Sequence, residues 1–252
     1  MEKYGKIELV NRKEIKIKMI IKLNEPLKFK LKQPIELEIS DIIKEKIDVY
    51  WKEFIKNKKD YWDGDIFVVT NVDSNDNIME ISKTKFSSLV YSKMNKDLII
   101  RPLFTSILLK TKDNKYIITK NNHNNINLIG GLADNQDFTD GNFIPDFCIH
   151  REVLEEIGID LNNNSQVLYY NMKFLKVPTN DENYYPIGIL YTGKLNFTSE
   201  DFEKYISNNN FDGEIKNCYF YSTEECLNLN LKKTDVSYLK EFISIENKDV
   251  GL

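Results

Sequence analysis

Three glutamates and one arginine gather in a short stretch of the chain, "HREVLEEIGID" at residues 150–160. On a helix, Glu152, Glu155 and Glu156 stand at positions i, i+3 and i+4, which places the three carboxylates on one face. Like charges at this spacing repel each other by roughly 0.2–0.5 kcal/mol per pair. Hard divalent cations such as Mg²⁺ or Mn²⁺ take oxygen ligands and would relieve that repulsion. The stretch therefore suggests a metal site on a helix, with Arg151 beside it.

A plainer interpretation treats the same stretch as an amphipathic helix. Val153, Leu154 and Ile157 would then face inward and the glutamates would face water. Arg151 would form only a surface ion pair, worth less than about 1 kcal/mol. In either case Gly158 predicts the end of the helix, because glycine readily adopts the left-handed conformation that closes helices.

The complete string is much more specific than the glutamates alone. With ordinary residue usage, a chance match is on the order of 10⁻⁷ per starting position. The string resembles the motif of the Nudix hydrolase superfamily (MutT-like), which ends R-E-apolar-x-E-E-x-G-apolar. This resemblance implies an enzyme that hydrolyses a diphosphate bridge with the help of Mg²⁺ or Mn²⁺. It implies Glu152, Glu155 and Glu156 as metal ligands, and Arg151 as a residue that pins a carboxylate in place.

The identity of the catalytic base stays open among Glu152, Glu155 and Glu214. Glu214 lies in "FDGEIKNCYF", in the loop before a late strand. Some Nudix enzymes have an extra ligand or base in that loop, although an exposed loop acid explains the residue equally simply. The two histidines, His123 and His150, are weaker candidates, and we expect neither to act in catalysis.

The upstream half of the motif departs from the family pattern. The family has a glycine fourteen residues, and a glutamate eight residues, before the arginine, where this chain has Asp137 and Phe143. The glycine pair Gly130–Gly131 would be the displaced start of the loop, unless it is an ordinary turn. Asp137, Asp140 and Asp146 are candidates to replace the glutamate, although each also suits a loop or a helix cap.

A longer loop and the preserved "REV", "EE" and glycine resemble the branch that includes UDP-glucose pyrophosphatases. "VYWKEFIKNKKDYWDGDIFVV" at 49–69 and "KTKFSSLVYS" at 83–92 resemble the N-terminal region of that branch and the strand before its catalytic domain. The resemblance implies hydrolysis of a UDP-sugar to UMP and sugar 1-phosphate. The alternatives are a hydrolase of ADP-ribose or another nucleotide, and a Nudix-fold binding or regulatory protein without turnover. Loops 131–146 and 178–186, the latter with Tyr184–Tyr185, would then select the substrate.

Composition limits the remaining possibilities. The 252 residues are 41% hydrophobic and 29% charged, with 35 basic and 39 acidic residues and a net charge of −4. The chain lacks the basic excess typical of nucleic-acid or anionic-membrane partners. The spacing of the three cysteines, Cys148, Cys218 and Cys226, matches neither a disulfide framework nor a zinc site. We expect Cys148 to be a buried core residue. No apolar run is long enough for a membrane span or a signal peptide, so we expect a cytoplasmic protein. The sequence does not indicate the oligomeric state.

Hydrophobic periodicity gives the order of the elements. Residues 7–39 alternate as strands interrupted at Pro26 and Pro34, and a helix capped by Ser40 or Asp41 follows. The later expected elements are strands over 66–72 and 78–92, a hairpin over 104–119, the carboxylate helix, strands over 166–177 and 184–195, a helix over 198–208, a strand over 216–222 and two terminal helices. We predict an α+β fold, a Nudix-type α/β/α sandwich with a mixed sheet at 97–252, preceded by a smaller N-terminal α/β region at 1–96.

Overall fold

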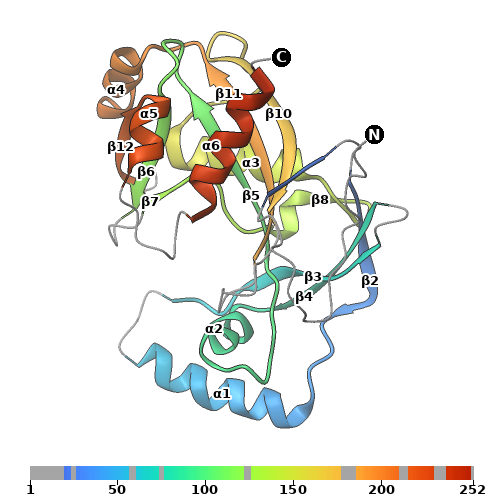
Figure 1. The fold of residues 1–252 in the computed structure, drawn as a ribbon. Helices are drawn as coiled ribbons and strands as arrows, with labels where there is room; N and C mark the ends of the chain where they lie inside the picture. Colours follow the sequence, from blue (N-terminus) through green and yellow to red (C-terminus); the bar gives the residue numbers. More distant parts are fainter. Residues whose placement is uncertain are drawn as a thin grey trace.

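The computed structural model describes eight stretches of the chain: residues 20–23, 27–56, 61–73, 77–121, 126–176, 186–209, 215–229 and 237–250. Within them, one large mixed sheet organises the fold (Figure 1). Its strand order is β1 (Ile20–Lys22), β10 (Val167–Lys176), β11 (Ile187–Leu195), β5 (Leu103–Lys110), β6 (Tyr116–Asn121) and β12 (Ile215–Tyr221), with β7 (Ile126–Asn127) also on β6. Only β11 and β5 pair in parallel; the other pairs are antiparallel.

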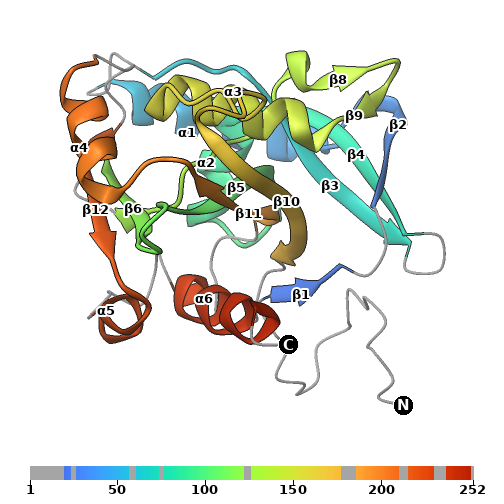
Figure 2. The ribbon, with the colours of Figure 1, turned by 90° about the horizontal axis from the view of Figure 1, so that it is seen from above.

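Helices cover both faces of this sheet (Figure 2). On one face, α3 (Pro145–Ile157) and α4 (Ser199–Ser207) pack into a core with Leu103 and Ile107 of β5. On the other, α5 (Thr223–Asn228) and α6 (Ser237–Val250) enclose a second core around Leu108 and Tyr116. Successive strand residues point to opposite faces, which is why neighbouring positions of β5 serve different cores. The predicted α+β sandwich with a mixed sheet is confirmed.

A smaller sheet precedes the large one. It has the order β2 (Lys28–Glu36), β4 (Ile78–Lys85), β3 (Asp65–Asp73), and it lies beside α1 (Asp41–Ile55) and α2 (Phe86–Met94) in Figure 1. Phe29 and Met79 of this sheet belong to the same hydrophobic core as Ile149 and Val153 of α3. The strand β1 pairs with β10 of the large sheet. The division at residue 96 stays a prediction.

Two local predictions were wrong. Residues 86–92, expected as a strand, form the first part of α2, because Phe86, Leu89 and Val90 repeat at helical spacing and pack inward or partly inward. Pro34 does not interrupt the second strand; β2 continues through it with a register shift against β4 between Leu31 and Glu36. Pro26 lies outside the described residues. No helix in the described stretches is long and apolar enough to cross a membrane.

Candidate active site

The carboxylate helix is α3, and both of its ends follow from the sequence. Pro145 occupies the first turn, where its missing N–H costs nothing. Gly158 ends the helix in the left-handed conformation, with φ 66° and ψ 19°, and its N–H donates to the Leu154 carbonyl at 3.0 Å. The expected glycine stop is confirmed. Leu154, expected to face inward, is exposed because it lies beside the buried stripe and not on it.

Glu152 does not face water. It lies on the buried stripe of α3 with Cys148, Ile149, Val153 and Ile157, and its side chain is only 11% exposed. The plain amphipathic interpretation therefore fails for this glutamate. A carboxylate at such a position needs partners, because desolvation penalises the charged form.

The loop containing Gly130 and Gly131 supplies one side of the site. It runs along β5, where the Thr105 N–H donates to the Gly131 carbonyl at 3.0 Å. A Cβ at Gly131 would lie 2.3 Å from Glu152 Oε1, so only glycine lets the backbone approach this carboxylate so closely. The Gly130 N–H donates to Glu156 Oε2 at 3.3 Å. The glycine pair thus contacts the carboxylate helix directly and is more than a plain turn.

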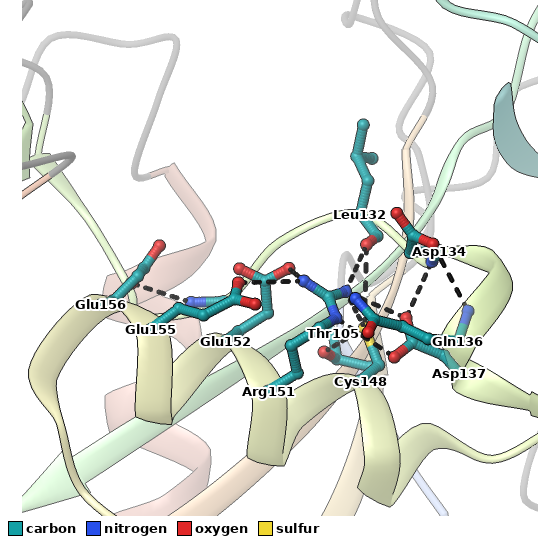
Figure 3. Close-up of polar contacts among 11 residues, drawn as sticks. Thr105, Leu132, Asp134, Gln136, Asp137, Cys148, Arg151, Glu152, Glu155 and Glu156 are labelled. Atoms are coloured by element: carbon teal, nitrogen blue, oxygen red, sulfur yellow. Dashed lines mark hydrogen bonds and ion pairs between the residues drawn. The ribbon is translucent and has the colours of Figure 1, made fainter. Parts of the chain in front are cut away.

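Arg151 connects the carboxylates (Figure 3). Its Nη1 donates to Glu152 Oε1 at 2.6 Å and to Glu155 Oε2 at 3.3 Å. Its Nη2 donates to the Leu132 carbonyl at 3.1 Å and to Asp137 Oδ2 at 2.9 Å, while Nε donates to Asp137 Oδ1 at 3.3 Å. Burial alone would lower the pKa of Arg151, but the Asp137 hydrogen bond and the Glu152 charge outweigh it and raise the pKa. Arg151 therefore stays charged and fixes the geometry of two carboxylates.

Asp137 holds Arg151 from the other side. Its side chain is 1% exposed and forms a reciprocal capping box with Asp134 in the short 3₁₀ helix Asn135–Asp137. Phe143, at the position where the family has a glutamate, is buried against Phe29.

The other two loop aspartates have different roles. Asp140 sits in a turn with φ 49°, and Asp146 accepts a hydrogen bond from the Tyr191 hydroxyl at 2.6 Å. Of the three candidates, only Asp137 contacts Arg151. Sequence spacing could not single it out, since a buried loop aspartate looks like an exposed one until its partner is known.

The three glutamates offer an all-oxygen donor set, which suits hard divalent cations. The carboxylates of Glu152 and Glu155 converge on one cationic nitrogen, Arg151 Nη1, so they can meet around a single positive charge. Glu156 lies one turn after Glu152 on α3, near Cys218, whose pKa is raised to about 12 by burial and by the Glu156 charge. Among the described residues, no group of three or more His, Cys, Asp or Glu is already arranged around one metal position. The donors thus fit Mg²⁺ or Mn²⁺ chemically, and Glu156 would have to join the other two.

The remaining candidate residues either lie apart from the three glutamates or fall outside the described residues. His150 turns to the far side of α3, where Nε2 lies 2.8 Å from the Tyr170 hydroxyl and Nδ1 lies 3.1 Å from Asn162 Nδ2. Cys148 is buried as expected, with the Thr105 hydroxyl donating to its Sγ at 3.2 Å. Glu214, His123 and Tyr184–Tyr185 lie outside the described residues.

The "WDGD" turn at 62–65 has a structural role. Asp63 Oδ1 accepts the Ser87 N–H at 2.7 Å, which caps the start of α2. Asp65 forms ion pairs with Lys83 at 3.0 Å and Lys85 at 2.7 Å. These contacts account for both aspartates without a ligand.

Comparisons with known proteins give similarity only to solved structures. Neither the protein-family models nor the curated proteins contain a match. A MutT protein from Methanosarcina mazei Go1 is 16% identical over 60% of this chain and 95% of its own, with a TM-score of 0.39. The NUDIX domain of Shewanella oneidensis NrtR, complexed with ADP ribose, is 13% identical over 62% of this chain and 92% of its own, with a TM-score of 0.42. A NUDIX-family hydrolase from Clostridium perfringens is 16% identical over 58% of this chain and 98% of its own, with a TM-score of 0.36. Identities and scores this low add no weight to a function, which must come from the site.

Proposed function

We propose that this chain is a Nudix pyrophosphohydrolase that cleaves the diphosphate bridge of a nucleoside diphosphate linked to another group. One observation carries the proposal: the R-E-V-L-E-E-I-G string forms a helix whose first glutamate lies against a glycine loop and is bound by its own arginine. A solvated helix surface requires neither contact.

The side chains have separable tasks in this proposal. Mg²⁺ or Mn²⁺, held by Glu152, Glu155 and Glu156, would neutralise the diphosphate and the charge that develops on it. Arg151 orients Glu152 and Glu155 through one nitrogen. Glu155, whose side chain is 46% exposed, is the most accessible carboxylate bound by Arg151 and can accept a proton from water. Glu152 and Glu214 remain the other candidates for the base.

The proposed substrate is a UDP-sugar, which would give UMP and a sugar 1-phosphate. Support comes from the resemblance of residues 49–69 and 83–92 to the UDP-glucose pyrophosphatase branch. The structural roles of the "WDGD" turn and of α2 weaken that support. We expect at least about a tenfold preference for a UDP-hexose over ADP-ribose and over nucleoside triphosphates, since sites that hydrogen-bond one substrate reject analogues strongly.

A panel of nucleoside diphosphate compounds, assayed for monophosphate release with Mg²⁺ or Mn²⁺, tests both levels. Glu156→Gln should lose most turnover, about 10²-fold or more, while staying folded. Glu203→Gln, an exposed glutamate of α4, is the matched control and should keep full activity. Unchanged turnover in Glu156→Gln, or in excess chelator, would disprove the metal assignment. Preferential cleavage of ADP-ribose would refute the UDP-sugar proposal alone.

A second candidate is a Nudix-fold binding protein without turnover. It is favoured by Phe143, a buried apolar residue at the position where the Nudix motif has a glutamate, and by the low exposure of Glu152. Titration calorimetry with the same compounds distinguishes the two. Binding without monophosphate release under either metal supports the second candidate.

A further inference from the structure

Arg101 stands out among the cations of this chain. The sequence has 35 basic residues but only three arginines, at positions 12, 101 and 151. Arg101 lies two residues before β5, the strand along which the glycine loop runs. Its Nε is buried and lacks a hydrogen-bond acceptor, while the residue as a whole is partly exposed. A buried guanidinium N–H without an acceptor is costly, so the position is explained best by an acceptor that arrives with a ligand.

The backbone around Arg101 is fixed on two sides. The Val69 N–H donates to the Arg101 carbonyl at 2.8 Å, and Pro102 forms a bridge with Val68. On the other side, the Ala133 N–H donates to the Leu103 carbonyl at 3.0 Å. Arg101 therefore lies where the smaller sheet, β5 and the loop after Gly131 meet.

Strand alternation places Arg101 on the face of α3. Leu103 and Ile107 belong to the core beneath α3, and the Thr105 hydroxyl donates to Cys148 of that helix. Residues two apart on an extended strand point to the same side. Arg101 lies two residues before Leu103, where β5 begins, and the same alternation continued to this position assigns its side chain to the face that carries the glutamates.

The spacing between the two features suits an extended ligand. Thr105 pairs with Gly131, which lies against Glu152. Arg101 precedes Thr105 by four residues, which corresponds to about 13 Å along a strand. One phosphate cannot cover that spacing, whereas a nucleotide joined to a second group can.

We propose that Arg101 binds an anionic group, a carboxylate or a phosphate, on the group joined to the nucleoside diphosphate. This proposal rests on the proposed function and narrows its substrate class to acidic conjugates, such as a nucleotide-linked sugar acid. The planar guanidinium matches either anion with paired hydrogen bonds, which a lysine cannot reproduce.

The experiment compares wild type, Arg101→Gln and Arg101→Lys on three substrates: a UDP-hexose, the matching UDP-hexuronate, and a dinucleoside polyphosphate. Arg101→Gln should raise KM for the acidic substrate by about tenfold to a hundredfold, the worth of one charged hydrogen bond. KM for the neutral UDP-hexose and all kcat values should stay within about threefold. Arg101→Lys should recover only part of the loss. A larger rise in KM for the UDP-hexuronate identifies the bound anion as a carboxylate, and a larger rise for the dinucleoside polyphosphate identifies it as a phosphate.

Two further measurements keep the test decisive. Thermal melting of ligand-free Arg101→Gln should match or exceed that of wild type, because the variant removes a buried N–H donor that has no acceptor. A large loss of stability, or an equal rise in KM for neutral and acidic substrates, would overturn the proposal. Lys112→Gln, an exposed cation just beyond the far end of β5, is the control and should change nothing. If wild type hydrolyses none of the three, calorimetric binding of the same compounds tests Arg101 separately from the proposed function.

Discussion

Replacing Gly131 with alanine separates the proposed site from the fold that carries it. The added Cβ would lie 2.3 Å from Glu152 Oε1, whereas ordinary Cβ contacts begin at 3.4 Å. The carboxylate must therefore move by about 1.1 Å, and Arg151, bound to it at 2.6 Å, must move with it or lose the contact. Displacements of about 1 Å at a reacting centre cost about 10²-fold in rate.

Stability should change little in the same variant. The backbone of Gly131 is not in the left-handed region, so alanine is conformationally tolerated. The obstructing atoms are the end of a flexible side chain, which can swing away without moving the core. We therefore expect a loss of about 10²-fold in kcat with a melting temperature near that of wild type.

The assay is monophosphate release from the best substrate of the panel, with Mn²⁺ affinity measured in parallel by calorimetry. Gly141→Asn is the matched control, because a Cβ at Gly141 meets nothing within 4 Å and asparagine tolerates its φ of 75°. Wild-type kcat and Mn²⁺ affinity in Gly131→Ala would refute the assignment of Glu152 to the site. Unfolding of the variant would show that the contact is structural.

Three further variants probe the charged groups. Asp137→Asn should lower the free energy of unfolding in urea by at least about 2 kcal/mol, because Arg151 loses a buried partner. The loss should stay below the roughly 3–5 kcal/mol typical of a buried charge left with no partner, since Arg151 keeps its other contacts. Glu246→Gln should cost about 3 kcal/mol, because Lys110, 2.7 Å away, is then left buried without a counter-charge. For Asp113, burial alone would raise the pKa, but hydrogen bonds from neighbouring hydroxyl and N–H groups lower it from 3.8 to about 2. Its stabilising contribution is therefore complete above about pH 4 and is lost as the pH falls toward 2, and Asp113→Asn should remove that part of the pH dependence of the urea midpoint.

The controls use exposed pairs of the same chemistry. Glu200→Gln breaks the ion pair with Lys204 on α4, where both side chains are more than half exposed, and should not shift the urea midpoint measurably. A shift equal to that of Glu246→Gln would mean that burial does not set the cost. A pH profile that is identical with and without Asp113 would contradict its lowered pKa.

The sequence predicted best where the signal is local. Pro145 and Gly158 mark the two ends of α3, and the Arg151 contact with Glu152 joins adjacent residues. The strands expected over 166–177 and 184–195 appear as β10 and β11, because a run of apolar and aromatic residues is a property of each segment itself.

Long-range packing decided the positions that the sequence did not predict. "FSSLVYS" has the β-branched and aromatic residues of a strand, but Asp63, more than twenty residues earlier, caps it as the helix α2. Asp137 is separated from Arg151 by fourteen residues, and only the folded loop brings their side chains together. The exposure of Leu154 depends on which face of α3 the sheet covers. Hydrophobic periodicity alone locates the edge of that face only to within one residue.

The pairing of β1 with β10 has a consequence for synthesis of the protein. Ile20 pairs with Lys176, 156 positions later in the chain. At about 5–20 residues per second, a ribosome needs roughly 8–30 s to travel from one strand to the other. During this interval β1 has no partner edge, and until residues 145–157 have been made Phe29 and Met79 lack the α3 residues of their shared core. Stalled nascent chains should therefore resist proteolysis only once β10 has emerged. For most of its time on the ribosome, the N-terminal part of this protein would be a client for chaperones.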